Sequence, residues 1–193
     1  FVQIPAFVCA PIMGLSIVIA RPLITLIFGD QWGQCIPYFQ ILCSAGLAVC
    51  LQGASNNSIS AIGMSKVLFK WTLFKRSATI IFCVGGILLA GMYGLLWACA
   101  LGAWFVYVVN AYLVEKYIGY SLLEQVKDVL PFVSLATVVG CIVFYVGTLC
   151  SCNEYATALV QVVLYTFLYV FSAFILKFEI AKYLLNVVVK NKK

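Results

Sequence analysis

Long uninterrupted runs of hydrophobic residues make up most of the chain, and only short polar stretches separate them. A helix needs about 20 mostly apolar residues to cross the hydrocarbon core of a bilayer. Transmembrane strands would instead show alternating polarity over segments of about ten residues. The pattern therefore predicts an all-α, polytopic transmembrane helix bundle with about six spans, at approximately residues 4–28, 36–62, 69–90, 93–114, 129–149 and 156–177.

The second run carries a stripe of small and polar residues. Gln40, Ser44, Ala48, Gln52 and Asn56 recur every four residues, so they share one slowly drifting face of a helix. Hydrogen bonding between packed membrane helices explains such a stripe. The wall of a polar cavity explains it equally well, and the two interpretations are compatible.

Arg21 lies about a turn and a half inside the far end of the first run, which also contains Pro5, Pro11 and Pro22. Interior prolines remove a backbone hydrogen bond, so we expect this helix to be kinked. Near the interface, a long cationic side chain can extend toward the headgroups. Charged residues within spans otherwise tend to face the bundle interior, where Arg21 would meet an anionic substrate. Both interpretations of Arg21 stay open.

The polar segment between the fourth and fifth runs predicts a short helix of its own. Ser121 and Glu124 have the spacing of a capping box, in which each residue bonds to the backbone of the other. Apolar residues then occupy one side of the helix and charged residues the other. We therefore expect an amphipathic cytoplasmic helix over about 121–130 that lies on the membrane surface and ends at Pro131.

The composition supports a membrane protein and argues against several other classes. The chain is 65% hydrophobic and 9% charged, whereas soluble domains average about 25% charged residues. It contains no histidine, which excludes histidine-dependent catalysis within this segment. No acidic cluster accompanies the nine cysteines, so we expect no metal site, no cofactor and no enzymatic activity. The net charge of +6 is better explained by membrane topology than by binding to nucleic acid.

The positions of the cations predict an orientation. Cytoplasmic loops are enriched in lysine and arginine, and eleven of the twelve cations follow the second, fourth and sixth runs. We therefore place these segments, and both ends of the chain, on the cytoplasmic side. The residues are Lys66, Lys70, Lys75 and Arg76 in the loop after the second run, Lys116 and Lys127 after the fourth, and Lys177, Lys182, Lys190, Lys192 and Lys193 after the sixth.

Several sequence blocks resemble polysaccharide exporters, namely the Wzx-type and colanic-acid-exporter-type lipopolysaccharide biosynthesis proteins. The blocks are APIMGLSIVIARPLITLIFGDQWGQCIPYFQILCSAGL, SISAIGMSKVLFK, GMYGLLWACALG and GYSLLEQVKDVLP, in the order and spacing expected for that family. The resemblance implies the MATE-like multidrug/oligosaccharidyl-lipid/polysaccharide exporter superfamily, with 12 to 14 helices in two lobes. Because the chain begins at Phe1 rather than Met, we expect an internal or C-terminal piece of a longer protein, and the resemblance implies that it holds the last six helices.

This resemblance also implies a function. A family member would flip an undecaprenyl-pyrophosphate-linked oligosaccharide across the bacterial inner membrane. Its partners would be this lipid-linked substrate, membrane lipid, the N-terminal half of the same chain and polysaccharide polymerases. The sugar must cross without meeting hydrocarbon, so a polar, preferably cationic cavity is required. The candidate cavity residues are Arg21, Gln40, Ser44, Gln52 and Asn56.

Two alternative functions stay open. A cation-coupled multidrug antiporter of the same superfamily usually needs an acid within the membrane, and all six acids here lie in loops or at helix ends. An integral-membrane glycosyltransferase or acyltransferase would need a sizeable loop with acids or histidine. The loops between the runs are short, which disfavours that class.

Overall fold

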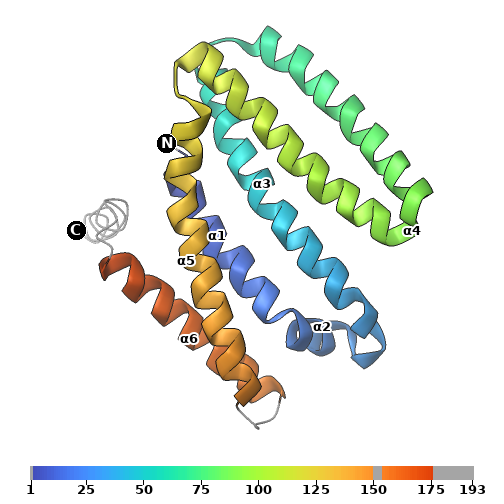
Figure 1. Cartoon of the computed structure of the whole chain (residues 1–193), viewed down its shortest axis with the longest axis vertical. Coiled ribbons are helices and arrows are strands. Elements are labelled where there is room, and N and C mark those ends of the chain that lie inside the picture. The colour runs from blue at the N-terminus through green and yellow to red at the C-terminus, as the bar shows by residue number, and fades with distance from the viewer. Residues whose placement is uncertain (1, 150–153, 176–193) are drawn as a thin grey trace.

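The structure is a computed structural model that describes residues 2–149 and 154–175 (Figure 1). Within these ranges the chain forms six α-helices and one 3-10 helix, which confirms the predicted all-α class. The cations that follow the sixth run, from Lys177 onward, and the end of the sixth predicted span lie outside the described residues. The elements are α1 (Gln3–Val18), α2 (Ala20–Phe28), η1 (Asp30–Cys35), α3 (Ile36–Ala61), α4 (Ser65–Ile118), α5 (Leu122–Leu149) and α6 (Glu154–Ile175).

The first apolar run is divided into α1 and α2, which meet at an angle of 71°. The break falls at Ile19, whose backbone is not helical (φ −92°, ψ 12°). Pro22 explains this position, because it has no N–H to donate to the carbonyl four residues earlier, at Val18, and its ring clashes with that carbonyl. The kink expected from the prolines thus occurs at Ile19, one turn before Pro22, while Pro11 lies inside α1.

Helix α4 is a helical hairpin. Its backbone leaves the helical region at Ala90 (φ −144°, ψ 24°) and Gly91 (φ 58°, ψ −134°), and the chain reverses direction there (Figure 1). We call residues 65–89 the first arm and residues 92–118 the second arm. The arms touch backbone to backbone, because a Cβ on Gly86 would lie 2.4 Å from the carbonyl oxygen of Gly94. Glycine at both positions is therefore needed for this close approach.

Length and hydropathy identify the helices that can cross a membrane. Four qualify by themselves, and the bent pair of α1 and α2 would be a fifth. This count treats α4 as one span, although each of its arms exceeds the roughly 20 residues that a span needs. With the hairpin divided at Gly91, the described residues contain as many as six membrane-crossing segments.

The predicted basic loop after residue 62 differs from the structure. Only a short turn separates α3 from α4, and Lys66, Lys70, Lys75 and Arg76 all lie in the first arm. The placement of these four cations in a loop is therefore wrong. Apolar residues at helical spacing extend the helix through this region, and three of them pack against Ile59, Leu113 and Val114; these three are Met64, Leu68 and Trp71.

The amphipathic segment over 121–130 is not a separate helix. It forms the first turns of α5, which continues through Pro131. Proline removes only one backbone bond, and membrane helices tolerate that loss. Neighbouring residues hold this start of α5 in place: the amide of Leu122 donates to Oε2 of Glu115 at 3.2 Å, and the buried side chain of Gln125 donates to the carbonyl of Ala111 at 3.2 Å.

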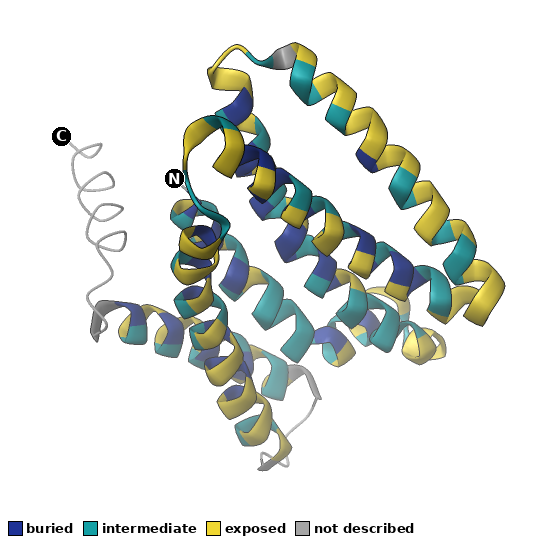
Figure 2. Ribbon diagram, turned by 45° about the horizontal axis from the view of Figure 1, so that its top comes forward, coloured by how far each residue is buried: buried dark blue, intermediate teal, exposed yellow. Residues whose placement is uncertain are grey.

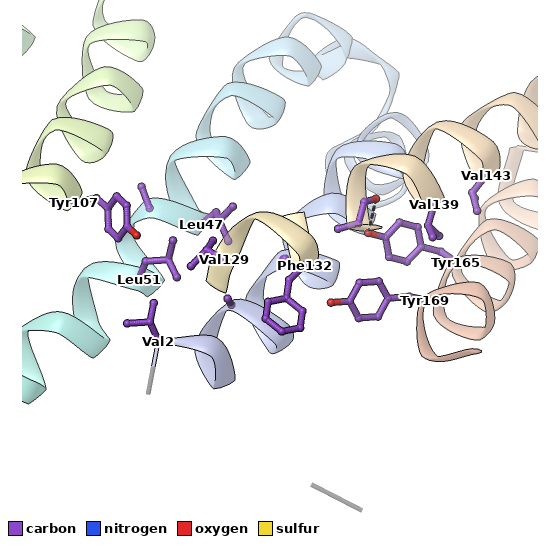
Figure 3. Packing of buried hydrophobic residues seen from close by; sticks show 14 residues of the cluster. Val2, Leu47, Leu51, Tyr107, Val129, Phe132, Val139, Val143, Tyr165 and Tyr169 are labelled. Carbon is purple, nitrogen blue, oxygen red and sulfur yellow. Dashed lines mark hydrogen bonds between the residues drawn. The ribbon is translucent and has the colours of Figure 1, made fainter. Parts of the chain in front are cut away.

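The core lies where α1, α3, α5 and α6 meet. Helix α1 packs against α3 and α5, and α6 packs against α5 (Figure 1). Two tyrosines of α6 reach across this junction. Tyr165 donates to the carbonyl of Ala136 at 3.2 Å (Figure 3), and Tyr169 donates to the carbonyl of Phe7 at 3.2 Å. Their rings are stacked, with centroids 6.4 Å apart. These contacts connect α6 to both α5 and α1.

The first arm of α4 is the least covered of the helices long enough to span a membrane. Among residues 66–89 of this arm, Lys75 alone is buried (Figure 2). Its exposed side chains are large and apolar, and such surfaces mark contact with lipid or protein. They include Phe69, Leu73, Ile80, Ile81, Leu88 and Leu89.

Candidate polar cavities

The polar stripe on α3 does not line a single cavity. Gln40 and Ser44 lie at a groove between α1, α3 and α5, whereas Gln52 and Asn56 lie at a separate pocket between α3 and the α4 hairpin. We call the first the apolar groove and the second the cationic pocket. The helix face predicted from the four-residue spacing exists, but different neighbours cover its two halves.

The apolar groove has a volume of about 440 Å³ and is lined mostly by carbon. Its polar side chains are engaged with backbone. Gln40 Nε2 donates to the carbonyl of Ile17 at 3.2 Å, and Ser44 Oγ donates to the carbonyl of Ile41 at 2.6 Å. Ile17 is near the end of α1, where the last four carbonyls lack helical partners. Gln40 therefore bonds α3 to the broken end of α1, as the packing interpretation of the stripe expects.

The cationic pocket has a volume of about 240 Å³ and three walls. Helix α3 contributes Gln52 and Asn56, and Gln52 Nε2 donates to the carbonyl of Ala103 on the second arm at 2.7 Å. The first arm contributes most of the polar groups. The complete lining is Val49, Gln52, Asn56, Thr72, Lys75, Arg76, Thr79, Cys99, Gly102, Ala103 and Val106.

Lys75 is the most unusual residue of this pocket. Its side chain is only 4% exposed, and its ammonium donates to Oδ1 of Asn110, which is itself completely buried. For the part of the chain that the structure describes, no carboxylate lines the pocket or pairs with Lys75. A buried charge is normally paired, because desolvation of an isolated ion costs several kcal/mol.

Two amide groups near Lys75 are incompletely bonded. Oδ1 of Asn56 and Nδ2 of Asn110 are buried and have no hydrogen-bond partner among the described residues. An unpaired buried amide group costs about 1–3 kcal/mol. The interface between α3 and the hairpin thus contains unused donors and acceptors next to a buried cation.

Arg21 lies elsewhere. It is the second residue of α2, its side chain is exposed, and it lines neither the apolar groove nor the cationic pocket. The five residues predicted to share a cavity are therefore distributed over three places in the structure.

Lys75 was missed as a cavity residue, and Asn110 was missed as its hydrogen-bond partner. Their signal was present in the sequence: Thr72, Lys75 and Thr79 follow one another at helical spacing, and Asn110 interrupts an otherwise apolar run. The helical spacing of Thr72, Lys75 and Thr79 was overlooked because Lys75 was assigned to a cytoplasmic loop. The burial of both residues depends on the hairpin, which brings residues 35 positions apart into contact.

A third cavity of about 520 Å³ lies near the start of α5 and includes Tyr120 and Asp128. The hydroxyl of Tyr120 donates to Oδ2 of Asp128. Burial, followed by the neighbouring Asp128 carboxylate, raises the pKa of Tyr120 well above its ordinary value. The hydroxyl therefore remains protonated and keeps the loop before α5 attached to that helix.

The fold and these cavities define a class, namely polytopic helical membrane proteins with polar groups enclosed by apolar helices. Among proteins of known role, the chain is similar to the lipopolysaccharide biosynthesis protein WzxC of Escherichia coli (strain K12). The two are 29% identical over 135 residues, which is 66% of this chain and 26% of that protein. No protein-family model and no solved structure matches the chain.

This similarity is distant. It confirms the predicted resemblance to lipopolysaccharide biosynthesis proteins as a distant one. The matched region corresponds to about a quarter of the length of WzxC.

Proposed function

We propose that the chain is the C-terminal lobe of a membrane transporter that flips lipid-linked oligosaccharide across the bacterial inner membrane. The substrate would be an undecaprenyl-pyrophosphate-linked oligosaccharide destined for surface polysaccharide or lipopolysaccharide. The observation that carries this proposal is the similarity to a lipopolysaccharide biosynthesis protein, over a segment that folds as an apolar helical bundle.

The polar cavities support this proposal on physical grounds. A polar group that enters hydrocarbon without hydrogen bonds costs several kcal/mol, so a sugar headgroup needs a path lined by polar side chains. Gln52, Asn56 and Lys75 offer such groups at a level enclosed by apolar helices. In transporters built from two lobes, the substrate site opens alternately to each side of the membrane. The second lobe would come from the rest of a longer chain, and polysaccharide polymerases would act on the flipped product.

Deletion of the gene is the direct test of the proposed function. We expect complete lipid-linked repeat units to accumulate on the cytoplasmic leaflet, and expression of the full-length protein to restore surface polysaccharide. Incomplete lipid-linked sugars would instead indicate a glycosyltransferase. Unchanged lipid-linked sugars with altered drug sensitivity would indicate an antiporter. Either of these two results would refute the proposal.

The proposed orientation has its own test. If the cations mark the cytoplasmic side, η1 faces the periplasm, because α3 crosses the membrane between them. A cysteine at Gln31 in η1 should then react with an impermeant maleimide added to intact cells, whereas a cysteine at Lys66 should react only after the membrane is opened. The side chains at both positions are exposed, so accessibility within the fold does not limit labelling. Labelling of Lys66→Cys in intact cells would contradict the proposed orientation and place Lys66 on the periplasmic side.

A further inference from the structure

The cationic pocket contains a buried charge that the described residues leave uncompensated. The ammonium of Lys75 has three donors, and Oδ1 of Asn110 accepts one of them. Asn110 is neutral, so it satisfies a hydrogen bond without balancing the charge. A buried ion without a partner is strongly destabilising, because it has lost its hydration and gained no opposite charge. A bound anion would remove this penalty.

A second cation borders the same space. Arg76 lines the pocket beside Lys75, and its guanidinium offers a planar set of donors suited to phosphate and carboxylate. Two neighbouring cations repel each other unless an anion lies between them. The acids whose side chains the structure describes, namely Asp30, Glu115, Glu124 and Asp128, are absent from the lining. An anionic ligand would supply the counter-charge.

The neutral groups narrow the chemical class of that ligand. The unpaired Oδ1 of Asn56 needs a donor, whereas Lys75 and Arg76 need acceptors. A carboxylate or an unprotonated phosphate would supply acceptors alone. A phosphate joined to a sugar supplies acceptor oxygens and, a few bonds away, hydroxyl donors, so this combination matches the pocket.

Size limits the ligand further. A volume of about 240 Å³ corresponds to the share of roughly eight water molecules in the liquid, at about 30 Å³ each. This is enough for a phosphate and an adjoining sugar ring, and too little for a whole oligosaccharide. Lys75 is ten residues, or about 15 Å along the helix, from the start of the first arm.

We propose that the cationic pocket between α3 and the α4 hairpin is a binding site for the phosphate of a lipid-linked sugar, held by Lys75 and Arg76. The need for an anion follows from the pocket alone, and its identity as a lipid-linked sugar phosphate rests on the proposed function. Oδ1 of Asn56 accepts a hydrogen bond from a hydroxyl of the adjoining sugar. Gln52 fixes the position of α3 relative to the second arm through its bond to Ala103.

Binding can be measured on the full-length protein in nanodiscs of zwitterionic lipid, with polyprenyl phosphate and polyprenyl-phosphate-linked monosaccharide as probes. The informative variant is Lys75→Gln, which removes the charge and keeps a donor for Asn110. Its matched control is Lys70→Gln, which removes the same charge from an exposed position of the same arm outside the pocket. Yield and a single monodisperse species in gel filtration establish that both variants are folded.

We expect both probes to raise the melting temperature of the wild-type protein and of Lys70→Gln. Lys75→Gln should bind at least about ten-fold more weakly, the factor expected when a charge-assisted bond is lost. Asn56→Leu should weaken binding of the sugar-linked probe more than binding of polyprenyl phosphate. Equal stabilisation by phosphatidylglycerol, or an effect that survives Lys75→Gln, would overturn the assignment.

This experiment reads binding alone, so it separates the site from the proposed function. Loss of binding in Lys75→Gln, together with normal lipid-linked sugars in the deletion strain, would retain the site and refute the transport proposal. Accumulated lipid-linked sugars together with unaltered binding by Lys75→Gln would retain the transport proposal and refute the site.

Discussion

The contact between Gly14 of α1 and Tyr165 of α6 allows a quantitative test of how the bundle is assembled. A Cβ placed on Gly14 would lie 2.5 Å from the Tyr165 hydroxyl oxygen and 3.5 Å from the ring carbon that carries it. Carbon packs favourably at about 3.5–4.0 Å, so the hydroxyl overlaps the added methyl group by about 1 Å and the ring does not. The hydroxyl oxygen of Tyr165 is therefore the atom that clashes with the added methyl group.

Tyr165 cannot easily move away from the added methyl group. Its hydroxyl donates to the carbonyl of Ala136 at 3.2 Å, and its ring is stacked on Tyr169. We expect Gly14→Ala to cost about 1–3 kcal/mol, the range for overpacked cores. Tyr165→Phe should cost about 0.5–1.5 kcal/mol, the value of a lost hydrogen bond.

The double variant should be far more stable than the sum of these effects predicts. Removal of the hydroxyl makes room for the methyl group, and alanine favours the helix over glycine by about 0.5–1 kcal/mol. The double variant should therefore be as stable as Tyr165→Phe or slightly more so, which corresponds to a coupling energy of about 1–3 kcal/mol, equal to the cost of Gly14→Ala alone. Thermal unfolding of the full-length protein in detergent measures all four species of this cycle.

Gly53→Ala is the control for the intrinsic effect of alanine. Gly53 lies within α3, and a Cβ there meets no atom within 4 Å. This variant should unfold at or above the wild-type temperature. Additive effects of Gly14→Ala and Tyr165→Phe would show that Tyr165 does not cover Gly14 and would refute the described packing of α6 on α1.

Two further predictions concern the α4 hairpin. Gly94→Ala would place a Cβ 2.0 Å from the backbone oxygen of Gly86, so it should destabilise the protein by about 1–3 kcal/mol or more. Gly85→Ala, beside Gly86 but with no atom within 4 Å of the new Cβ, should unfold near the wild-type temperature, and equal melting temperatures for the two variants would contradict the hairpin. The thiols of Cys83 and Cys99 face each other across the arms at 3.7 Å, so mild oxidation should join them, as peptide mass spectrometry can detect. The yield of this disulfide should fall in Gly94→Ala and not in Gly85→Ala, whereas an absent disulfide in the wild-type protein would mean that the arms do not meet there.

Local chemistry was sufficient to predict the class of fold. Apolar runs of membrane length favour helices, because hydrocarbon offers no partner for an exposed backbone. The predicted third run ends at residue 90 and the fourth begins at residue 93, and Gly91 between them adopts the positive φ (58°) that glycine tolerates best. Prolines in the first run indicated a kink, which occurs one turn before Pro22.

The environment of each polar side chain could not be predicted from spacing. A four-residue period shows that Gln40 and Gln52 share a helix face, but it contains no information about which helix covers that face. In the structure α1 covers the first residue and the α4 hairpin covers the second, so one stripe serves two cavities. Arg21 lies outside both linings for the same reason, since the bend at Ile19 redirects α2.

The burial of Lys75 was decided by tertiary structure alone. In the sequence, Lys75 and Arg76 follow Lys66 and Lys70 in one basic cluster, and positive charges near the end of a span usually lie in the cytoplasm. The hairpin brings Asn110 against Lys75 and encloses the lysine between two helical arms and α3. Apolar runs determine that helices form because each residue acts with its neighbours along the chain. Whether a charge lies in water or in a pocket depends on contacts between residues far apart in sequence, and these exist only once the helices have packed.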